Sequence, residues 1–98
     1  MPTGLTPKHA EQGHRGAFFL EKEGERLAEM TFTRSNPKLV LIDHTEVSDL
    51  LRGQGAGREL LDALVKWARE SQTKVIAVCP FAKAQFEKDA TIRDVLST

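Results

Sequence analysis

The chain reads Leu51-Arg52-Gly53-Gln54-Gly55-Ala56-Gly57-Arg58 directly before an amphipathic helix pattern that spans residues 59–68. Glycine allows positive φ and lets a ligand come close to the backbone. The first amides of a helix have no intrahelical partner, and the helix dipole favours negative charge there. The stretch therefore predicts a cradle in which backbone amides from Gln54 to Arg58 bind a phosphate or pyrophosphate. Arg52 and Arg58 flank this cradle and can add charge-assisted hydrogen bonds.

Two other phosphate-binding loops fit the stretch less well. A Walker A loop needs Lys-Ser or Lys-Thr after its last glycine, whereas Arg58 and Glu59 follow here. A dinucleotide fingerprint needs Gly-x-Gly-x-x-Gly in a first βαβ unit, whereas these glycines alternate at 53, 55 and 57 and come after other apparent strands. A nucleotide-binding protein is therefore disfavoured.

The stretch resembles motif A of the GCN5-related N-acetyltransferases (GNAT), Gln/Arg-x-x-Gly-x-Gly/Ala, because Arg52, Gly55 and Gly57 fill its three positions. Five residues earlier, Val47 stands where that family often has a strand-end residue whose backbone meets the pantetheine arm. The resemblance implies acetyl-CoA or CoA as the cofactor. The cofactor-binding residues that it implies are Val47, Arg52, Gly53, Gln54, Gly55, Ala56, Gly57, Arg58 and Phe86. Phe86 has a second interpretation, as part of the core.

Length and composition indicate one small domain. The chain has 98 residues, with 14 basic and 14 acidic side chains. We expect residues 1–12 to be a flexible lead-in and residues 13–98 to form a single acetyl-CoA-binding domain. No basic excess points to nucleic acid, and no apolar run resembles a membrane span or a signal peptide. We therefore expect a cytoplasmic monomer or homodimer.

The cysteine and histidine content argues against a disulfide and against a metal site. Cys79 is the only cysteine, which excludes an internal disulfide and fits a reducing compartment. Three histidines together with this cysteine show no metal-ligand spacing, so we expect no metal.

Apolar periodicity predicts an α/β (α+β) fold. It indicates strands at 15–22, 26–33 and 38–47, a helix at 55–71, a strand at 74–79, a helix at 82–88 and a further turn at 91–96. The helical crossover makes the last strand parallel to the one at 38–47. The predicted elements follow one another as βββαβα. They form one mixed sheet, in which an antiparallel meander is followed by one βαβ unit. Leu60, Leu64, Val65 and Trp67 or Ala68 are expected to close one face of it.

This order resembles the central part of the acetyltransferase fold and implies a minimal version of it. The resemblance covers roughly Arg15 to Lys88. The two helices that such enzymes usually insert after the first strand are absent, and no room remains for their last two strands. Both parts normally help to form the acceptor pocket. The acceptor is therefore left open as a small-molecule or protein amine.

A second motif of the family, Asn-x-x-Ala-x-x-x-Tyr-x-Lys, is only partly matched. Cys79 takes the asparagine position, Ala82 the alanine, Phe86 the tyrosine and Lys88 the lysine. The sequence contains no tyrosine, so the family's usual general acid is missing. The phrases Cys79-Pro80-Phe81 and His44-Thr45-Glu46-Val47 instead resemble a small acetyltransferase-like subfamily of about one hundred residues, the YjdJ type, in which a cysteine at this place is thought to matter.

His44, Glu46 and Cys79 are the candidate catalytic residues, because all three fall near the carboxyl ends of parallel strands. His44 and Glu46 share a strand face, since they are two residues apart. In direct transfer, Glu46 or His44 would accept a proton from the acceptor amine, and Cys79 or water would protonate the leaving thiolate. In a covalent route, Cys79 would be a partly exposed nucleophile activated by a nearby His44. Alternatively, Cys79 is a small buried hydrophobic residue, and His44 and Glu46 are structural.

The predicted function is acetyl-CoA-dependent transfer of an acetyl group to an amine of unknown identity. The alternative is a CoA-binding module with little or no catalysis, such as a sensor or partner subunit. The missing tyrosine and the missing acceptor-pocket elements favour this alternative, and the presence of His44, Glu46 and Cys79 favours the enzyme.

Overall fold

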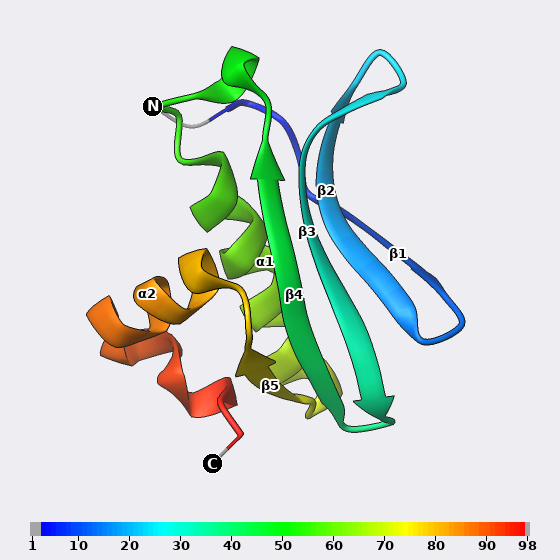
Figure 1. Cartoon of the computed structure of the whole chain (residues 1–98), viewed down its shortest axis with the longest axis vertical. Coiled ribbons are helices and arrows are strands. Elements are labelled where there is room, and N and C mark those ends of the chain that lie inside the picture. The colour runs from blue at the N-terminus through cyan, green and yellow to red at the C-terminus, as the bar shows by residue number, and fades with distance from the viewer. Residues whose placement is uncertain (1–2, 98) are drawn as a thin grey trace.

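The computed structural model describes residues 3–97. Its elements follow one another as β1 (Lys8–Gln12), β2 (Arg15–Lys22), β3 (Glu25–Asn36), β4 (Leu39–Val47), the 3-10 helix η1 (Asp49–Leu51), α1 (Ala56–Ser71), β5 (Lys74–Ala77), α2 (Pro80–Lys88) and the 3-10 helix η2 (Ala90–Val95). They form one mixed sheet in the order β1-β2-β3-β4-β5 (Figure 1). The first three strand pairs are antiparallel and β4 pairs with β5 in parallel. The predicted meander and βαβ unit are confirmed.

The structure adds one strand that the sequence analysis assigned to a loose lead-in. β1 pairs with β2 at the edge of the sheet, with His9 opposite Phe18. The His9 ring also stacks on Phe18, with 4.4 Å between ring centroids, and meets Trp67 edge-on. All five residues of β1 are exposed, so this strand lacks the apolar alternation from which a strand is predicted.

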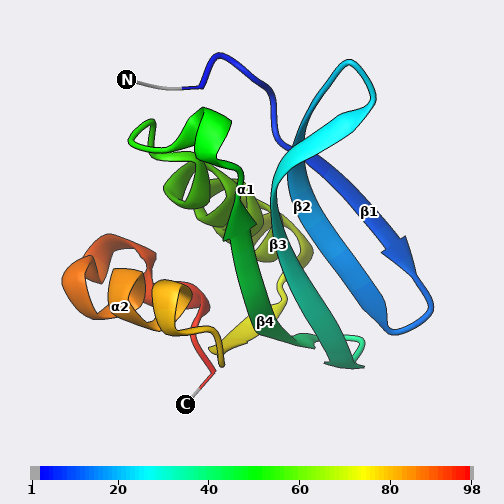
Figure 2. The same ribbon diagram turned by 45° about the horizontal axis from the view of Figure 1, so that its top comes forward.

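Helix α1 covers one face of the sheet (Figure 2), and its apolar side forms the centre of the core. Leu60, Leu64, Val65 and Ala68 are buried, as predicted, and Trp67 packs against them while partly exposed. The largest fully buried strand side chains beneath the helix are Leu20, Met30, Phe32, Val40, Ile42 and Val75. None of the helices within residues 3–97 is long and apolar enough to cross a membrane.

An ion-pair network joins α1 to α2. The Arg58 guanidinium donates to Asp62 at 2.8 Å, to Gln85 at 3.1 Å and also to Asp89. Hydrogen bonds from Thr91 and Arg58 lower the pKa of Asp89 to about 2, from an ordinary value of 3.8. The same contacts with Asp62 and Asp89 raise the pKa of Arg58. The network holds the C-terminal end of α2, at Gln85 and Asp89, against the first turns of α1.

Leu64→Ala tests the packing of α1. We expect it to cost about 2–5 kcal/mol of unfolding free energy, because Leu64 is fully buried and the change leaves a cavity. Tm is then expected to fall by roughly 10 °C or more. Lys66→Ala, at an exposed position on the same helix, is the control and should change stability by less than about 0.5 kcal/mol. Equal melting curves for the two variants would contradict this packing.

The Asp89 network predicts a loss of stability in acid. The folded pKa of about 2 lies below the ordinary 3.8, so this stabilisation is complete above that ordinary value and disappears as the pH falls toward 2. In Asp89→Asn, the unfolding free energy should fall less steeply as the pH is lowered, which urea unfolding at several pH values would measure. Some loss of stability in acid should remain in this variant, because a hydrogen bond from Arg69 also lowers the pKa of Asp94. Glu87→Gln is the control, and an unchanged acid side in Asp89→Asn would refute the assignment.

Candidate functional site

Strands β4 and β5 separate after Ile42. β5 pairs with β4 only from Leu39 to Ile42, and the Ile42 carbonyl then accepts the amides of both Val78 (3.0 Å) and Cys79 (2.9 Å). β5 thus ends at Ala77, two residues before the predicted end, while β4 continues to Val47. The separation leaves the β5-facing edge of β4 unpaired beyond Ile42, and such an edge offers peptide groups to a ligand.

A β-bulge at Asp43 determines which way the last residues of β4 face. Ile42 lies opposite Phe32, but His44 already lies opposite Thr31, so no residue of β3 stands opposite Asp43 in the register. The Asp43 side chain instead accepts a hydrogen bond from the Thr33 hydroxyl at 2.6 Å. One extra residue reverses the facing of every residue after it. Val40 and Ile42 therefore face the core, whereas His44 and Glu46 face the sheet surface that is opposite α1.

The glycine-rich loop has the open backbone that phosphate binding requires. Gly53 and Gly55 have φ of 79° and 73°, and a Cβ at either position would meet no atom within 4 Å. Gly55 caps α1, and the first amide bonded within the helix is that of Glu59, which donates to Gly55 at 3.0 Å. The amides of Ala56, Gly57 and Arg58 therefore precede the intrahelical hydrogen bonds and are available to an anion.

A pocket of about 250 Å³ opens at this loop. It is lined by Leu51 together with six of the residues that the sequence analysis selected for the cofactor, namely Val47, Arg52, Gly53, Gly55, Ala56 and Gly57. The Arg52 side chain is 81% exposed and pairs with the equally exposed Asp49 at 2.7 Å. Such an exposed pair is weak, so Arg52 can turn to a phosphate at small cost.

Three of the residues predicted to bind the cofactor have side chains or amides that are already engaged elsewhere in the structure. The Gln54 amide already donates to Leu51 at 3.2 Å, and its side chain donates to Leu50. The Arg58 guanidinium is bonded to Asp62, Gln85 and Asp89, so the backbone amide is the group that Arg58 offers to an anion. Phe86 is 3% exposed and belongs to the core, away from the loop pocket.

Gly57 has a structural role that its place in the motif did not indicate. It is buried, and a Cβ there would lie 2.8 Å from Cζ of Phe81. The ring of Phe81 thus packs on the first turn of α1, which only a glycine permits. This contact between α1 and α2 joins residues far apart in the chain, so no local pattern could have predicted it.

The three candidate catalytic residues form two separate groups. His44 Nε2 lies 3.0 Å from Glu46 Oε1, with side chains 62% and 68% exposed. Cys79 is only 3% exposed, and its Sγ lies 3.2 Å from Oγ1 of Thr45. Thr45 lies opposite the fully buried Met30, so it faces the core side and His44 faces away. The expectation of a partly exposed Cys79 beside His44 is therefore wrong, and Thr45 is the residue that the sequence analysis missed.

Comparison with known proteins identifies the family of the chain. The sequence model of the GCN5-related N-acetyl-transferase family matches residues 17–95 of the chain. The structure is similar to a GCN5-like putative N-acetyltransferase from Staphylococcus aureus solved by NMR, with 40% identity and a TM-score of 0.72 over 97% of this chain and 90% of that one. A search of curated proteins gave no match.

More distant structures share the fold. A ribosomal-protein-alanine N-acetyltransferase from Brucella melitensis biovar Abortus 2308 matches with 21% identity and a TM-score of 0.61, over 76% of this chain and 62% of that one. An aminoglycoside N-acetyltransferase in complex with CoA matches with 12% identity and a TM-score of 0.53, over 83% of this chain and 68% of that one. With the family match over residues 17–95, the chain belongs to the GCN5-related N-acetyltransferase family.

Proposed function

We propose that this protein binds acetyl-CoA and transfers its acetyl group to an amine. The proposal rests mainly on the pocket at the glycine-rich loop, before the start of α1. This pocket is lined by Val47 at the end of β4, by Arg52 and by the open glycines Gly53 and Gly55. Family membership supports acetyl transfer in general. A cytoplasmic location, as either a monomer or a homodimer, is part of the same proposal.

The residues present fit the phosphate groups of CoA. Unpaired amides of Ala56, Gly57 and Arg58 would hold the pyrophosphate, and the Arg52 side chain would add a positive charge. The free edge of β4 up to Val47 would receive the amide-containing arm. When bound, acetyl-CoA would supply an acetyl carbon for attack by the amine nitrogen and a thiolate leaving group, which would depart with the C–S electron pair and take up a proton.

The His44–Glu46 pair is the proposed base. The acceptor amine is an ammonium ion near neutral pH and must lose a proton before it can attack. The 3.0 Å contact lets Glu46 orient the His44 ring. Both side chains are largely exposed, so the proton can pass on to solvent.

Cys79 is proposed as a proton donor to the leaving thiolate, with the Thr45 hydroxyl as its partner. The two side chains lie 3.2 Å apart where β4 and β5 separate. The 3% exposure of Cys79 supports direct transfer over a covalent route, because a buried thiol is a poor nucleophile. The absence of tyrosine from the sequence supports the alternative, a CoA-binding module without catalysis.

Calorimetric titration tests the cofactor. We expect acetyl-CoA to bind more tightly than ATP or NAD. Gly55→Val should weaken acetyl-CoA binding about tenfold or more, the equivalent of losing one hydrogen bond to a charged phosphate. Gly13→Val is the matched control, because Gly13 also has positive φ (62°) and open space around it but lies in the β1–β2 turn. Equal losses of affinity in the two variants would contradict the assignment of this loop as the acetyl-CoA site.

Alkylation of Cys79 tests the route of transfer. We expect slow reaction with iodoacetamide near neutral pH in the folded protein and fast reaction in denaturant, because the thiol is buried. His44→Ala should leave the rate unchanged, because His44 faces the other side of β4. Fast labelling of the folded protein that His44→Ala slows would favour the covalent route instead.

A further inference from the structure

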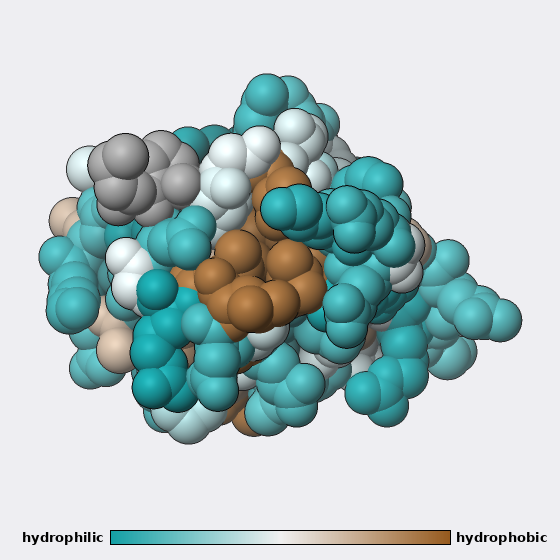
Figure 3. All heavy atoms as spheres, turned by 90° about the horizontal axis from the view of Figure 1, so that it is seen from above, coloured by the Kyte–Doolittle hydropathy of each residue, from teal (hydrophilic) through white to brown (hydrophobic). Residues whose placement is uncertain are grey.

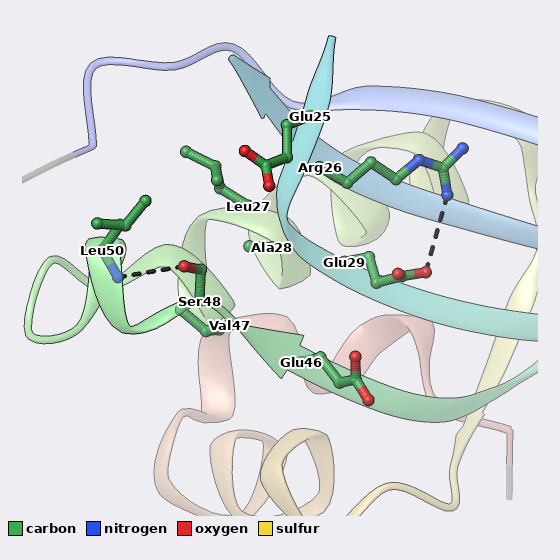
Figure 4. A pocket seen from close by; sticks show the side chains of 9 residues that line it. All are labelled: Glu25, Arg26, Leu27, Ala28, Glu29, Glu46, Val47, Ser48 and Leu50. Carbon is green, nitrogen blue, oxygen red and sulfur yellow. Dashed lines mark hydrogen bonds and ion pairs between the residues drawn. The ribbon is translucent and has the colours of Figure 1, made fainter. Parts of the chain in front are cut away.

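A second cavity, of about 460 Å³, lies at the end of β4 on the side of β3. Figure 4 shows side chains from the first residues of β3 on one side and from the end of β4 and η1 on the other. Val47 lines both this cavity and the loop pocket, so the two meet at the end of β4. Glu46 of the proposed base also lines the cavity. We call this cavity the β3–β4 groove.

The charges in the β3–β4 groove are predominantly negative. Glu25, Glu29 and Glu46 face a single cation, Arg26. Arg26 is already engaged, because its guanidinium lies 3.7 Å from Glu29 and 3.8 Å above the ring of Phe19. Glu29 and Glu46 also stand directly opposite each other on neighbouring strands, an arrangement in which like charges repel. A ligand that brings positive charge would relieve this repulsion.

The other wall of the groove is apolar. Leu27 is 7% exposed, whereas Val47 and Leu50 are 40% and 71% exposed and offer apolar surface to a ligand. Figure 3, which views the molecule from the end that carries η1, shows an apolar patch surrounded by hydrophilic side chains. The groove therefore combines a hydrocarbon contact surface with an excess of carboxylates.

We propose that the β3–β4 groove binds the acetyl acceptor and that this acceptor is a short aliphatic diamine. The inference rests on the proposed function. One amino group loses its proton to the His44–Glu46 pair and reacts, while the second keeps its positive charge near Glu25 and Glu29. The hydrocarbon chain between them lies against Leu50. The cavity volume is within the range of small-molecule sites, which favours a small acceptor over a protein segment.

The experiment compares 1,4-diaminobutane with butylamine, which has the same hydrocarbon chain but one charge. Binding to the CoA-loaded protein is followed by NMR chemical shifts, and acetyl transfer is followed by release of free CoA thiol. We expect diaminobutane to bind more tightly and to shift amides of Glu25, Glu29 and Leu50. The double variant Glu25→Gln/Glu29→Gln should weaken diaminobutane binding roughly two- to tenfold, as expected for exposed ion pairs, and leave CoA affinity unchanged.

Glu23→Gln is the matched control, because Glu23 lies in the β2–β3 turn just before Glu25, does not line the groove and forms no ion pair within residues 3–97. It should leave diaminobutane binding unchanged. Equal binding of the two amines, or equal binding by the wild type and the double variant, would overturn the inference. So would a lysine-containing tetrapeptide that is acetylated better than diaminobutane. Failure to bind CoA or to acetylate any amine would instead refute the proposed function, and diaminobutane binding would still test the groove.

Discussion

The whole site depends on the separation of β4 from β5 at the Ile42 carbonyl. This one acceptor takes the amides of both Val78 and Cys79, which turns the chain out of the sheet and into α2 at Pro80. Proline has no backbone N–H to continue the hydrogen bonds of a sheet, and it suits the first turn of a helix. Because β5 leaves so early, the last residues of β4 have a free edge beside the loop that opens α1.

The glycines of the loop serve two different physical needs. Gly53 and Gly55 adopt positive φ and keep the backbone open to a ligand, whereas Gly57 makes room for the ring of Phe81. The contact between Gly57 and Phe81, with the Arg58 network beside it, holds α2 against α1. The three glycines of this motif therefore have different structural roles: Gly53 and Gly55 keep an open loop backbone, and Gly57 permits close packing.

The bulge at Asp43 divides the chemistry of β4 between its two faces. His44 and Glu46 lie on the solvent side with the β3–β4 groove, and Thr45 lies on the core side with Cys79. In the proposed reaction, an acetyl group at the edge of β4 would have the proposed base on one side and the proposed proton donor on the other.

The sequence by itself determined most of the elements, the mixed sheet and the glycine-rich loop before α1, because apolar periodicity and a glycine motif before a helix are local signals. It also determined that His44 and Glu46 share a face, since their spacing is two residues. Only the tertiary structure decided that Thr45 rather than His44 meets Cys79, because a one-residue bulge reverses the facing of a strand and leaves no clear mark in the sequence. The same holds for the strand at Lys8–Gln12, which is stabilised by pairing with β2 and by aromatic contacts rather than by a pattern of its own.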